Sequence, residues 1–320
     1  MATRWGICTA GKISHDFCGA LQTLSSKDHQ IVAVGARRLE DARQFADRFN
    51  IPRAYGSYEE LAEDKDIDVV YIATIHPYHH AVCRLFLKQN HNILCEKPLT
   101  LSLRGTQELL AEAQARKVFF MEIRKELREG TLGEVRMLVA SICLPLDSVD
   151  RIRKRELGGG GLMDIGCYAV QAANLVFPGK PEKIDVEGVF YEEGVDMGGC
   201  IILKYSGGRL ANLSYHTATE DGANRLAILG SKGNIVVPGH FWCADRLVTP
   251  SGEKVFPFPG CSCDFNFDNS IGFTYEIDAV RDCLNKGLKE CPAMPHSDTE
   301  TIMFILEEIQ RQLGVTYDYP

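Results

Sequence analysis

The chain has 320 residues, of which 45% are hydrophobic and 24% charged, a profile typical of a globular protein with two domains of ordinary size. It contains no apolar run long enough to cross a membrane and no signal-peptide core, so the sequence predicts a cytoplasmic protein with no membrane partner. Residues 1–122 carry 15 basic and 15 acidic residues, so the whole net charge of −8 lies beyond them, which argues against a nucleic-acid partner.

Strands and helices are predicted to alternate through the first 122 residues. Apolar runs typical of strands buried on both faces of a sheet occur at 3–8, 30–35, 68–73, 91–95 and 117–122. Helices are expected at 14–24, 39–49, 77–89 and 102–116, and Ser57 with Glu60 reads as a capping box that begins another helix. This alternation predicts an α/β class protein whose residues 1–122 form a Rossmann-type domain with a doubly wound parallel sheet.

Beyond residue 122, strand-like stretches follow one another with few helices between them. They occur at 135–142, 183–191, 200–205, 209–217, 225–229, 233–237 and 247–249. Helices are expected only at 164–177, 275–286 and 299–313. Residues 123–320 are therefore predicted to form a C-terminal α+β domain with a large, mostly antiparallel open sheet. One face of that sheet would lack helices and would need a partner, which predicts a homodimer through the sheet. The same domain is expected to bind the substrate.

The turn after the first strand predicts a dinucleotide site. Aligned on the fingerprint G-x-G-x-x-G, it reads Thr9-x-Gly11-x-x-Ser14, so only the glycine that lets the backbone approach a pyrophosphate remains. Thr9 and Ser14 can donate to phosphate, and Lys12 and Ile13, which lie between Gly11 and Ser14, are expected in the same cofactor site. An ordinary βα turn is the alternative, but the strand before it and the helix after it favour a cofactor site.

The end of the second strand bears on the choice between NAD and NADP. NAD enzymes carry an acid there that binds the ribose 2′-hydroxyl, whereas this strand ends in Gly35-Ala36-Arg37-Arg38. Arginines suit a 2′-phosphate, because a guanidinium is always charged and can bind two oxygens at once. Arg37 and Arg38 therefore predict NADP, with a solvated basic turn as the alternative.

A lysine follows the strand at 91–95, in the turn Glu96-Lys97-Pro98. The carboxyl end of a parallel strand lies at the crevice where such sheets bind ligands. Burial there beside a cationic nicotinamide would lower the pKa of the lysine and suit it to proton transfer. The neighbouring strand ends in a segment that contains Thr74, His76 and His79, so we expect these residues in the same cofactor site as Glu96 and Lys97.

No metal site is predicted. His76 and His80 are four residues apart, but Pro77 and the lack of a third ligand argue against zinc. The 12 cysteines are scattered without a C-x-x-C pair, which indicates reduced thiols rather than a disulfide framework. Cys261-Ser262-Cys263 is the one pair that could bind a soft metal, and two ligands are too few.

Two motifs together resemble the Gfo/Idh/MocA oxidoreductases. One is Glu96-Lys97-Pro98 after a Rossmann strand. The other is G-G-x-x-x-D-x-G-x-[HY], which here ends in Asp164-Ile-Gly166-Cys-Tyr168. The resemblance extends over nearly the whole chain, including Ala54–Leu61 and Asn266–Asn269.

The resemblance implies that Lys97 is the catalytic acid/base and that Asp164 and Tyr168 orient the reacting hydroxyl and the lysine. The same resemblance places further side chains in the site: Tyr71 and His79 beside the cofactor, and Trp242 and Phe267 with Asp164 around the substrate. Such aromatic residues suit a flat apolar ring. An exposed lysine is the alternative for Lys97, and core packing is the alternative for Tyr168.

The activity implied by the resemblance is NADP-dependent oxidation of trans-1,2-dihydrobenzene-1,2-diol to catechol and of D-xylose to its lactone, by hydride transfer. The implied partners are a small-molecule substrate, either a cyclic diol or a sugar, and a second copy of the chain. Another sugar or polyol dehydrogenase of the same family is the alternative.

The chain departs from the family pattern at Met121-Glu122, which runs directly into Ile123–Gly130. About a dozen residues of the family spacing, an aromatic, arginine and proline segment across the substrate mouth, are absent there. Their loss predicts a chain that binds NADP but turns over poorly, or an inactive regulator. Ile142-Cys143 also replaces an aromatic residue followed by glycine, which affects the shape of the pocket.

Overall fold

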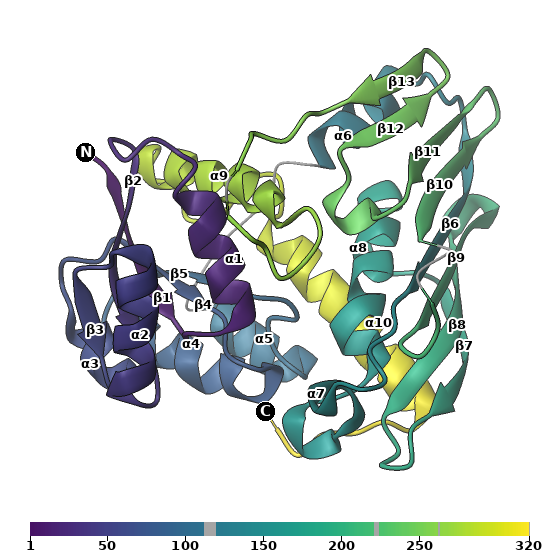
Figure 1. The fold of residues 1–320 in the computed structure, drawn as a ribbon. Coiled ribbons are helices and arrows are strands. Elements are labelled where there is room, and N and C mark those ends of the chain that lie inside the picture. The colour runs from purple at the N-terminus through teal and green to yellow at the C-terminus, as the bar shows by residue number, and fades with distance from the viewer. Residues whose placement is uncertain (112–119, 221–223, 262, 320) are drawn as a thin grey trace. The chain divides into compact units, whose positions relative to one another are not determined.

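The computed structural model describes residues 1–111, 120–220, 224–261 and 263–319 (Figure 1). The chain divides into two compact units. The first unit comprises Met1–Thr100, Gln107–Phe119 and Phe258–His296, and the second comprises Leu101–Thr106, Phe120–Pro257 and Ser297–Pro320. None of the helices among the described residues is long and apolar enough to cross a membrane.

Five parallel strands form the sheet of the first unit, in the order β3-β2-β1-β4-β5 (Figure 1). They are β1 (Thr3–Cys8), β2 (His29–Gly35), β3 (Arg53–Tyr55), β4 (Val69–Ile72) and β5 (Asn92–Cys95). The predicted doubly wound parallel sheet is confirmed. The strand order reverses between β1 and β4, and ligands of such sheets bind at this point, beyond the carboxyl ends of the strands.

Each face of this sheet packs against its own set of helices. One core holds α1 (Lys12–Leu21), α2 (Leu39–Phe49) and α9 (Phe273–Asn285), and the other holds α3 (Tyr58–Glu63) and α4 (His79–Lys88). Successive residues of β4 alternate between these cores: Val69 and Tyr71 face the first, and Val70 and Ile72 face the second. Burial on both faces explains why the strands read as continuous apolar runs.

The expected capping box at α3 forms with one change of partner. The Ser57 hydroxyl accepts the backbone N–H of Glu60 at 3.1 Å, as predicted. The Glu60 carboxylate accepts the N–H of Gly56 at 3.0 Å rather than that of Ser57. The first turn of α3 is therefore held from both sides, as in a capping box.

The strand expected at 117–122 does not form where the structure can test it. Residues 117–119 lie outside the described residues, and Phe120–Glu122 belong to helix α6 (Phe120–Glu129). The apolar run that suggested a strand is short, and a short run cannot be distinguished from part of a helix by periodicity alone. Helix α5 (Leu103–Leu110) precedes it.

Eight strands form the open sheet of the second unit, in the order β13-β12-β11-β10-β6-β9-β8-β7. They are β6 (Val135–Cys143), β7 (Lys183–Phe190), β8 (Asp196–Tyr205), β9 (Arg209–His216), β10 (Arg225–Gly230), β11 (Asn234–Pro238), β12 (Arg246–Thr249) and β13 (Gly252–Val255). Every neighbouring pair is antiparallel except β6 and β9. The predicted mostly antiparallel open sheet is confirmed.

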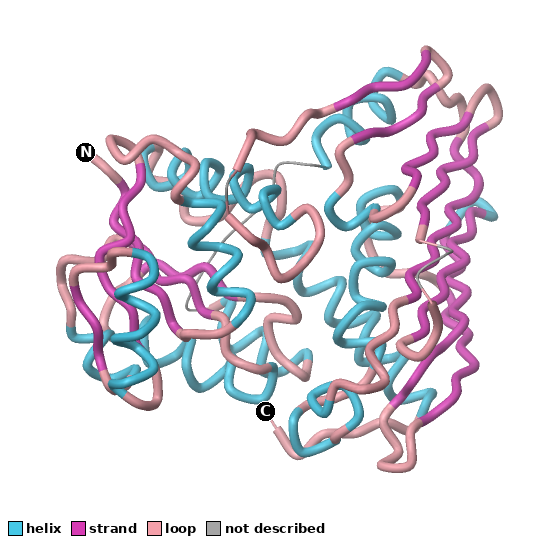
Figure 2. Tube along the Cα trace, viewed as in Figure 1, coloured by secondary structure: helices cyan, strands magenta, loops and turns pink. Residues whose placement is uncertain are grey.

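Helices α8 (Cys167–Val176) and α10 (His296–Leu313) lie on one face of this sheet, as Figure 2 shows. Burial alternates along β8, where Ile201 and Leu203 are buried while Cys200 and Ile202 are exposed. Short helical segments occur at α7 (Asp150–Arg153) and η5 (Phe241–Cys243). A π turn, η3 (Leu162–Gly166), leads into α8.

Candidate active site

Gly11 opens α1 directly after the first strand of the parallel sheet. Its backbone is extended, with φ of −96°, a conformation that any residue can adopt. A methyl group built at Gly11 would contact only the Thr9 hydroxyl, at 3.3 Å. The backbone does not require glycine here and only the Thr9 side chain would have to shift, so the space beside Gly11 suits the close approach of a ligand. Because α1 has no side-chain N-cap, its first backbone donors also suit a pyrophosphate.

Hydroxyl groups flank this turn. Thr9 Oγ1 donates to the carbonyl of Ala73 at 3.2 Å, which joins the β1 turn to the end of β4. The hydroxyls of Ser14 and Thr74 are buried and have no hydrogen-bond partner among the residues that the structure describes. Unpartnered buried hydroxyls are uncommon, and here they fit a polar ligand at the carboxyl ends of the strands. The residues present therefore fit a dinucleotide.

The two arginines after β2 differ in their surroundings. Arg38 forms a double ion pair with Asp41 in the first turn of α2, with Nε 2.7 Å from Oδ2. The Arg38 guanidinium holds the pKa of Asp41 below its usual value. Arg37 is exposed and makes no ion pair among the described residues. Arg37 is thus the guanidinium available to a phosphate.

The turn Glu96-Lys97-Pro98 follows β5, and its Lys97–Pro98 peptide bond is cis. Tyr71 on the neighbouring strand β4 is fully buried, and its hydroxyl donates to Glu96 Oε1 at 2.6 Å. The other carboxylate oxygen of Glu96 accepts the N–H of Lys97 at 3.2 Å. Tyr71 therefore acts on the turn through Glu96.

His79 holds the same turn from α4. Its fully buried ring lies with Nδ1 2.7 Å from the carbonyl of Pro98 and Nε2 2.8 Å from the carbonyl of Thr74. Burial lowers the pKa of His79, but Cys95 and these two acceptors more than reverse the effect and raise it to about 9. Because its ring lies between these two carbonyls, His79 links the lysine turn to the end of β4.

His76 and His80 take other partners. The ring of His76 lies edge-on to that of His79, with centroids 5.8 Å apart, and His80 Nε2 lies 3.0 Å from Glu108. The described residues contain no group of three or more His, Cys, Asp or Glu arranged to hold a metal ion.

Asp164 lies in the π turn of the second unit, where it is almost fully buried. Arg151 Nη1, from α7, donates to its Oδ1 at 2.6 Å. Sequence reasoning missed Arg151, although the basic run 151–155 before the glycine-rich segment was a possible signal. A single π turn inside a helix often marks a functional site.

A buried carboxylate supports this turn from β8. Asp196 Oδ2 accepts the N–H of Leu162 at 2.6 Å and the hydroxyl of Tyr215 at 2.8 Å. Burial raises the pKa of Asp196 above its usual value, although these bonds oppose the shift. Gly160 has φ of +122°, which favours glycine, and a methyl group there would lie 2.6 Å from Asp196 Oδ1. Glycine-rich residues 158–161 thus allow close contact with Asp196.

Tyr168 and Trp242 come together in the second unit. Their rings stack with centroids 6.1 Å apart and an interplanar angle of 28°. The His240 ring also stacks on Trp242, with centroids 4.9 Å apart. The proposed hydroxyl-orienting residue therefore adjoins an aromatic surface.

Phe267 lies in the first unit and is half exposed. The segment that carries it is bound to Asp16 of α1, which is fully buried. Asp16 accepts the N–H groups of Asn266 and Phe267, at 2.9 and 3.0 Å, and the hydroxyl of Ser270 at 2.7 Å. Sequence reasoning missed Asp16, because its partners lie about 250 residues away along the chain.

Comparison with protein-family models identifies both units. An oxidoreductase family model with an NAD-binding Rossmann fold matches residues 3–123, and a GFO/IDH/MocA C-terminal domain model matches residues 120–236. The parallel-sheet unit is thus a nicotinamide-dinucleotide-binding domain of a dehydrogenase.

Curated relatives match along the whole chain. The trans-1,2-dihydrobenzene-1,2-diol dehydrogenase of Xenopus tropicalis is 46% identical, over 99% of this chain and 100% of its own length. The human protein of the same name is 42% identical, over 99% of this chain and 98% of its own. The chain therefore belongs to the Gfo/Idh/MocA oxidoreductase family.

Solved structures agree on the fold. An aldose-aldose oxidoreductase from Caulobacter crescentus superposes with a TM-score of 0.82 at 19% identity, over 98% of both chains. An oxidoreductase from Agrobacterium radiobacter, solved with NAD+ and L-tartaric acid, gives 0.82 at 16% identity, over 98% of this chain and 97% of its own.

Proposed function

We propose that this chain oxidises trans-1,2-dihydrobenzene-1,2-diol to catechol, and D-xylose to its lactone, with NADP+ as hydride acceptor. The observation that carries the proposal is the Glu96-Lys97-Pro98 turn, which Tyr71 and His79 hold at the carboxyl end of β5. Identity of 46% to a dihydrodiol dehydrogenase over 99% of the chain supports the choice of substrate.

The proposed chemistry assigns a role to each side chain. The bound nicotinamide would supply the acceptor for the hydride. Lys97 Nζ would take the proton of the reacting hydroxyl, and it would return that proton to solvent. Asp164 and Tyr168 would orient the hydroxyl, with the carboxylate of Asp164 itself fixed by Arg151. Trp242, stacked on Tyr168, and the exposed ring of Phe267 would offer apolar surfaces to the substrate.

NADP is the proposed cofactor because Arg37 is an exposed cation without an ion-pair partner among the described residues, whereas Arg38 is bound to Asp41. A 2′-phosphate would pair with Arg37. The proposed contacts to the remaining part of the cofactor come from the backbone at Gly11, Lys12 and Ile13 and from the hydroxyls of Thr9 and Thr74.

The test replaces the proposed acid/base. Lys97→Met should reduce the rate of NADPH formation by about a hundredfold or more, as expected for loss of general acid–base catalysis, while the affinity for NADPH measured by fluorescence stays within about twofold. Lys88→Met, at the exposed end of α4, is the matched control. The assay offers the dihydrodiol, D-xylose and myo-inositol. An unchanged rate in Lys97→Met would refute the mechanism, and preference for myo-inositol would indicate another polyol dehydrogenase.

One observation favours a second candidate, an NADP-binding protein with weak turnover or a regulatory role. The alignment with the Xenopus tropicalis relative spans 330 positions, ten more than the chain has residues. A shortened pocket wall would impair substrate alignment more than cofactor binding. Tight NADPH binding with negligible turnover of every substrate would favour this candidate, whereas a normal kcat would exclude it.

We also propose a homodimer in the cytoplasm. Exposed apolar side chains on the sheet strands of the second unit, among them Ile202 of β8 and Leu210 of β9, support association through that sheet.

A further inference from the structure

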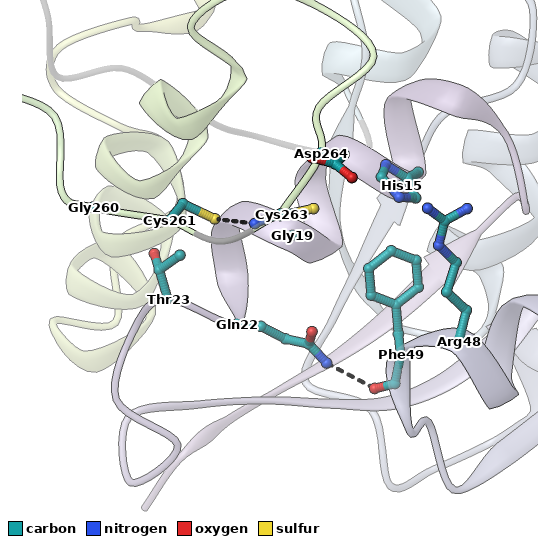
Figure 3. Close-up of a pocket in the computed structure, with 10 residues that line it drawn as sticks. All are labelled: His15, Gly19, Gln22, Thr23, Arg48, Phe49, Gly260, Cys261, Cys263 and Asp264. Atoms are coloured by element: carbon teal, nitrogen blue, oxygen red, sulfur yellow. Dashed lines mark hydrogen bonds between the residues drawn. The ribbon is translucent and has the colours of Figure 1, made fainter.

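A pocket of about 570 Å³ lies in the first unit, lined by α1, the end of α2 and the segment before Phe267 (Figure 3). Its lining includes His15, Thr23, Arg48, Cys261, Cys263 and Asp264. The residues that flank the β1, β4 and β5 strand ends do not line it, so its chemistry is separate from the proposed dehydrogenase site.

The two thiols of this pocket differ. Cys261 is exposed, and its sulfur accepts the backbone N–H of Cys263 at 3.2 Å. This N–H therefore donates to the sulfur that would carry the negative charge if Cys261 attacked as a thiolate. Cys263 is half-buried against α1, where a methyl group at Gly19 would clash with its sulfur. Burial raises the pKa of the Cys263 thiol, with Cys261 and Asp16 adding to the effect. Cys261 is thus the better attacking thiol.

Charged groups of both signs share the pocket. Arg48 lies over the ring of Phe49, 5.9 Å from its centroid, and makes no ion pair among the described residues. Asp264 likewise has no ion-pair partner in the described part of the chain. In Figure 3 Arg48 and His15 lie at one end of the lining and Cys261 and Thr23 at the other. A small zwitterionic peptide could therefore pair its carboxylate and its ammonium with opposite charges while its sulfur meets Cys261.

We propose that this pocket is a thiol–disulfide exchange site for a carboxylate-bearing disulfide of low molecular weight, with Cys261 as the attacking thiol and Cys263 as the resolving thiol. The Cys261 thiolate attacks one sulfur of the disulfide, whose S–S bond breaks. One half leaves as a thiolate that takes a proton, and the other stays on Cys261 as a mixed disulfide.

Cys263 completes the exchange. Its thiol gives its proton to solvent, and its sulfur attacks Cys261 Sγ, which expels the second half of the disulfide as a thiol. Two protein thiols are oxidised to a Cys261–Cys263 disulfide while one small disulfide is reduced to two thiols.

Glutathione disulfide is the probe, applied to the full chain, with acid quenching, alkylation and peptide mass analysis at successive times. Free N-acetylcysteine, assayed in parallel, is the reference thiol. Cys261 should react about fivefold or more faster than this reference, because the backbone N–H of Cys263 donates to its sulfur. Cys263→Ser should accumulate the mixed disulfide on Cys261, whereas the unaltered chain should proceed to the internal disulfide.

A second arm tests the charged lining. Arg48→Gln should slow the reaction of Cys261 with glutathione disulfide about fivefold or more and leave its reaction with the neutral bis(2-hydroxyethyl) disulfide unchanged. The proposal is overturned if Cys261 reacts no faster than the reference thiol, if Cys263→Ser accumulates no mixed disulfide, or if Arg48→Gln affects both disulfides alike. The first comparison uses the unaltered protein, so it does not depend on the folding of any variant.

Discussion

At the scale of single residues, the two arginines after β2 predict different effects on cofactor choice. Arg37→Gln should weaken NADPH binding by roughly 10- to 100-fold, because it removes charge-assisted hydrogen bonds worth about 1.5–3 kcal/mol, and should leave NADH binding unchanged. Arg38→Gln is the matched control, since Arg38 is bound to Asp41. Titration of each variant with both cofactors measures the effect. Equal weakening by the two substitutions would contradict the role of Arg37.

A second prediction concerns Asp16, which holds the segment that carries Phe267. Asp16→Asn should destabilise the fold by about 1–3 kcal/mol for each donor left unsatisfied and should loosen the segment that carries Phe267. The hydrogen exchange of residues 263–270 should rise. Unfolding in urea measures the loss of stability, with Asp268→Asn, on the same segment, as the control. Unchanged exchange in Asp16→Asn would contradict the anchoring role.

Asp16 should also make the stability of the fold depend on pH. Burial raises the pKa of Asp16, but hydrogen bonds from Asn266, His15 and Ser270 outweigh it and hold that pKa below its ordinary value. A group whose pKa is lower in the folded state adds stability above its unfolded pKa and loses it as the pH falls through the folded pKa. The stability difference between the unaltered chain and Asp16→Asn should therefore be constant near neutral pH and shrink below about pH 4. Urea unfolding across this range measures it.

Local sequence signals were enough to place residues at the ends of strands. They were not enough to single out residues whose partners are distant along the chain. Gly11 and Lys97 stand next to apolar runs, and the carboxyl end of a parallel strand is a position with known consequences. Nothing in the sequence around Arg151 and Asp196 distinguishes them from other charged residues. The fold brings both to the turn that carries Asp164. Their importance comes from partners distant in sequence, which no local pattern contains.

At the scale of elements, the glycine-rich entry to the π turn offers a controlled test. Gly160→Ala should lower stability by about 1–3 kcal/mol through its positive φ and by more through contact with Asp196, and it should reduce turnover by displacing Asp164. Gly179→Ala is the matched control, since its φ is +98° and a methyl group there meets nothing within 4 Å. Thermal melts measure the stability of both variants, and steady-state assays measure their kcat. Equal kcat in the two would contradict the proposed support of Asp164.

Elements with strong periodicity were predictable, and short or composite ones were not. The helix expected at 39–49 forms with the same bounds, because its apolar residues recur at helical spacing and its first turn is acidic. Strand β3 has three residues, too few for a period to register. The helix expected at 164–177 begins instead with a π turn at Leu162, whose backbone N–H is bound by Asp196, a partner that lies 34 residues away along the chain.

At the scale of the whole molecule, the proposed dimer makes a prediction about the open sheet. Ile202→Lys on β8 should convert dimer to monomer, because a charge would then be buried in an apolar interface. Leu288→Lys, an apolar position in the other unit that is also exposed, should leave the dimer intact. Sedimentation velocity of both variants measures the change. A chain that is monomeric without any substitution would contradict the proposal.

The discontinuity of the first unit has a consequence for how the protein is made. One core of the first unit contains Trp5, Phe17 and Tyr71 together with Ile277 and Val280 of α9. Helix α9 is followed along the chain by only one other helix, α10, so this wall of the core is synthesised late. A nascent chain that has just left the ribosome with its five parallel strands still exposes this apolar surface until α9 emerges. The unit whose strands are translated first is thus incomplete until about residue 296, after all eight strands of the second sheet have been made. Chaperones that bind apolar surface should associate with it throughout synthesis of the eight-stranded sheet.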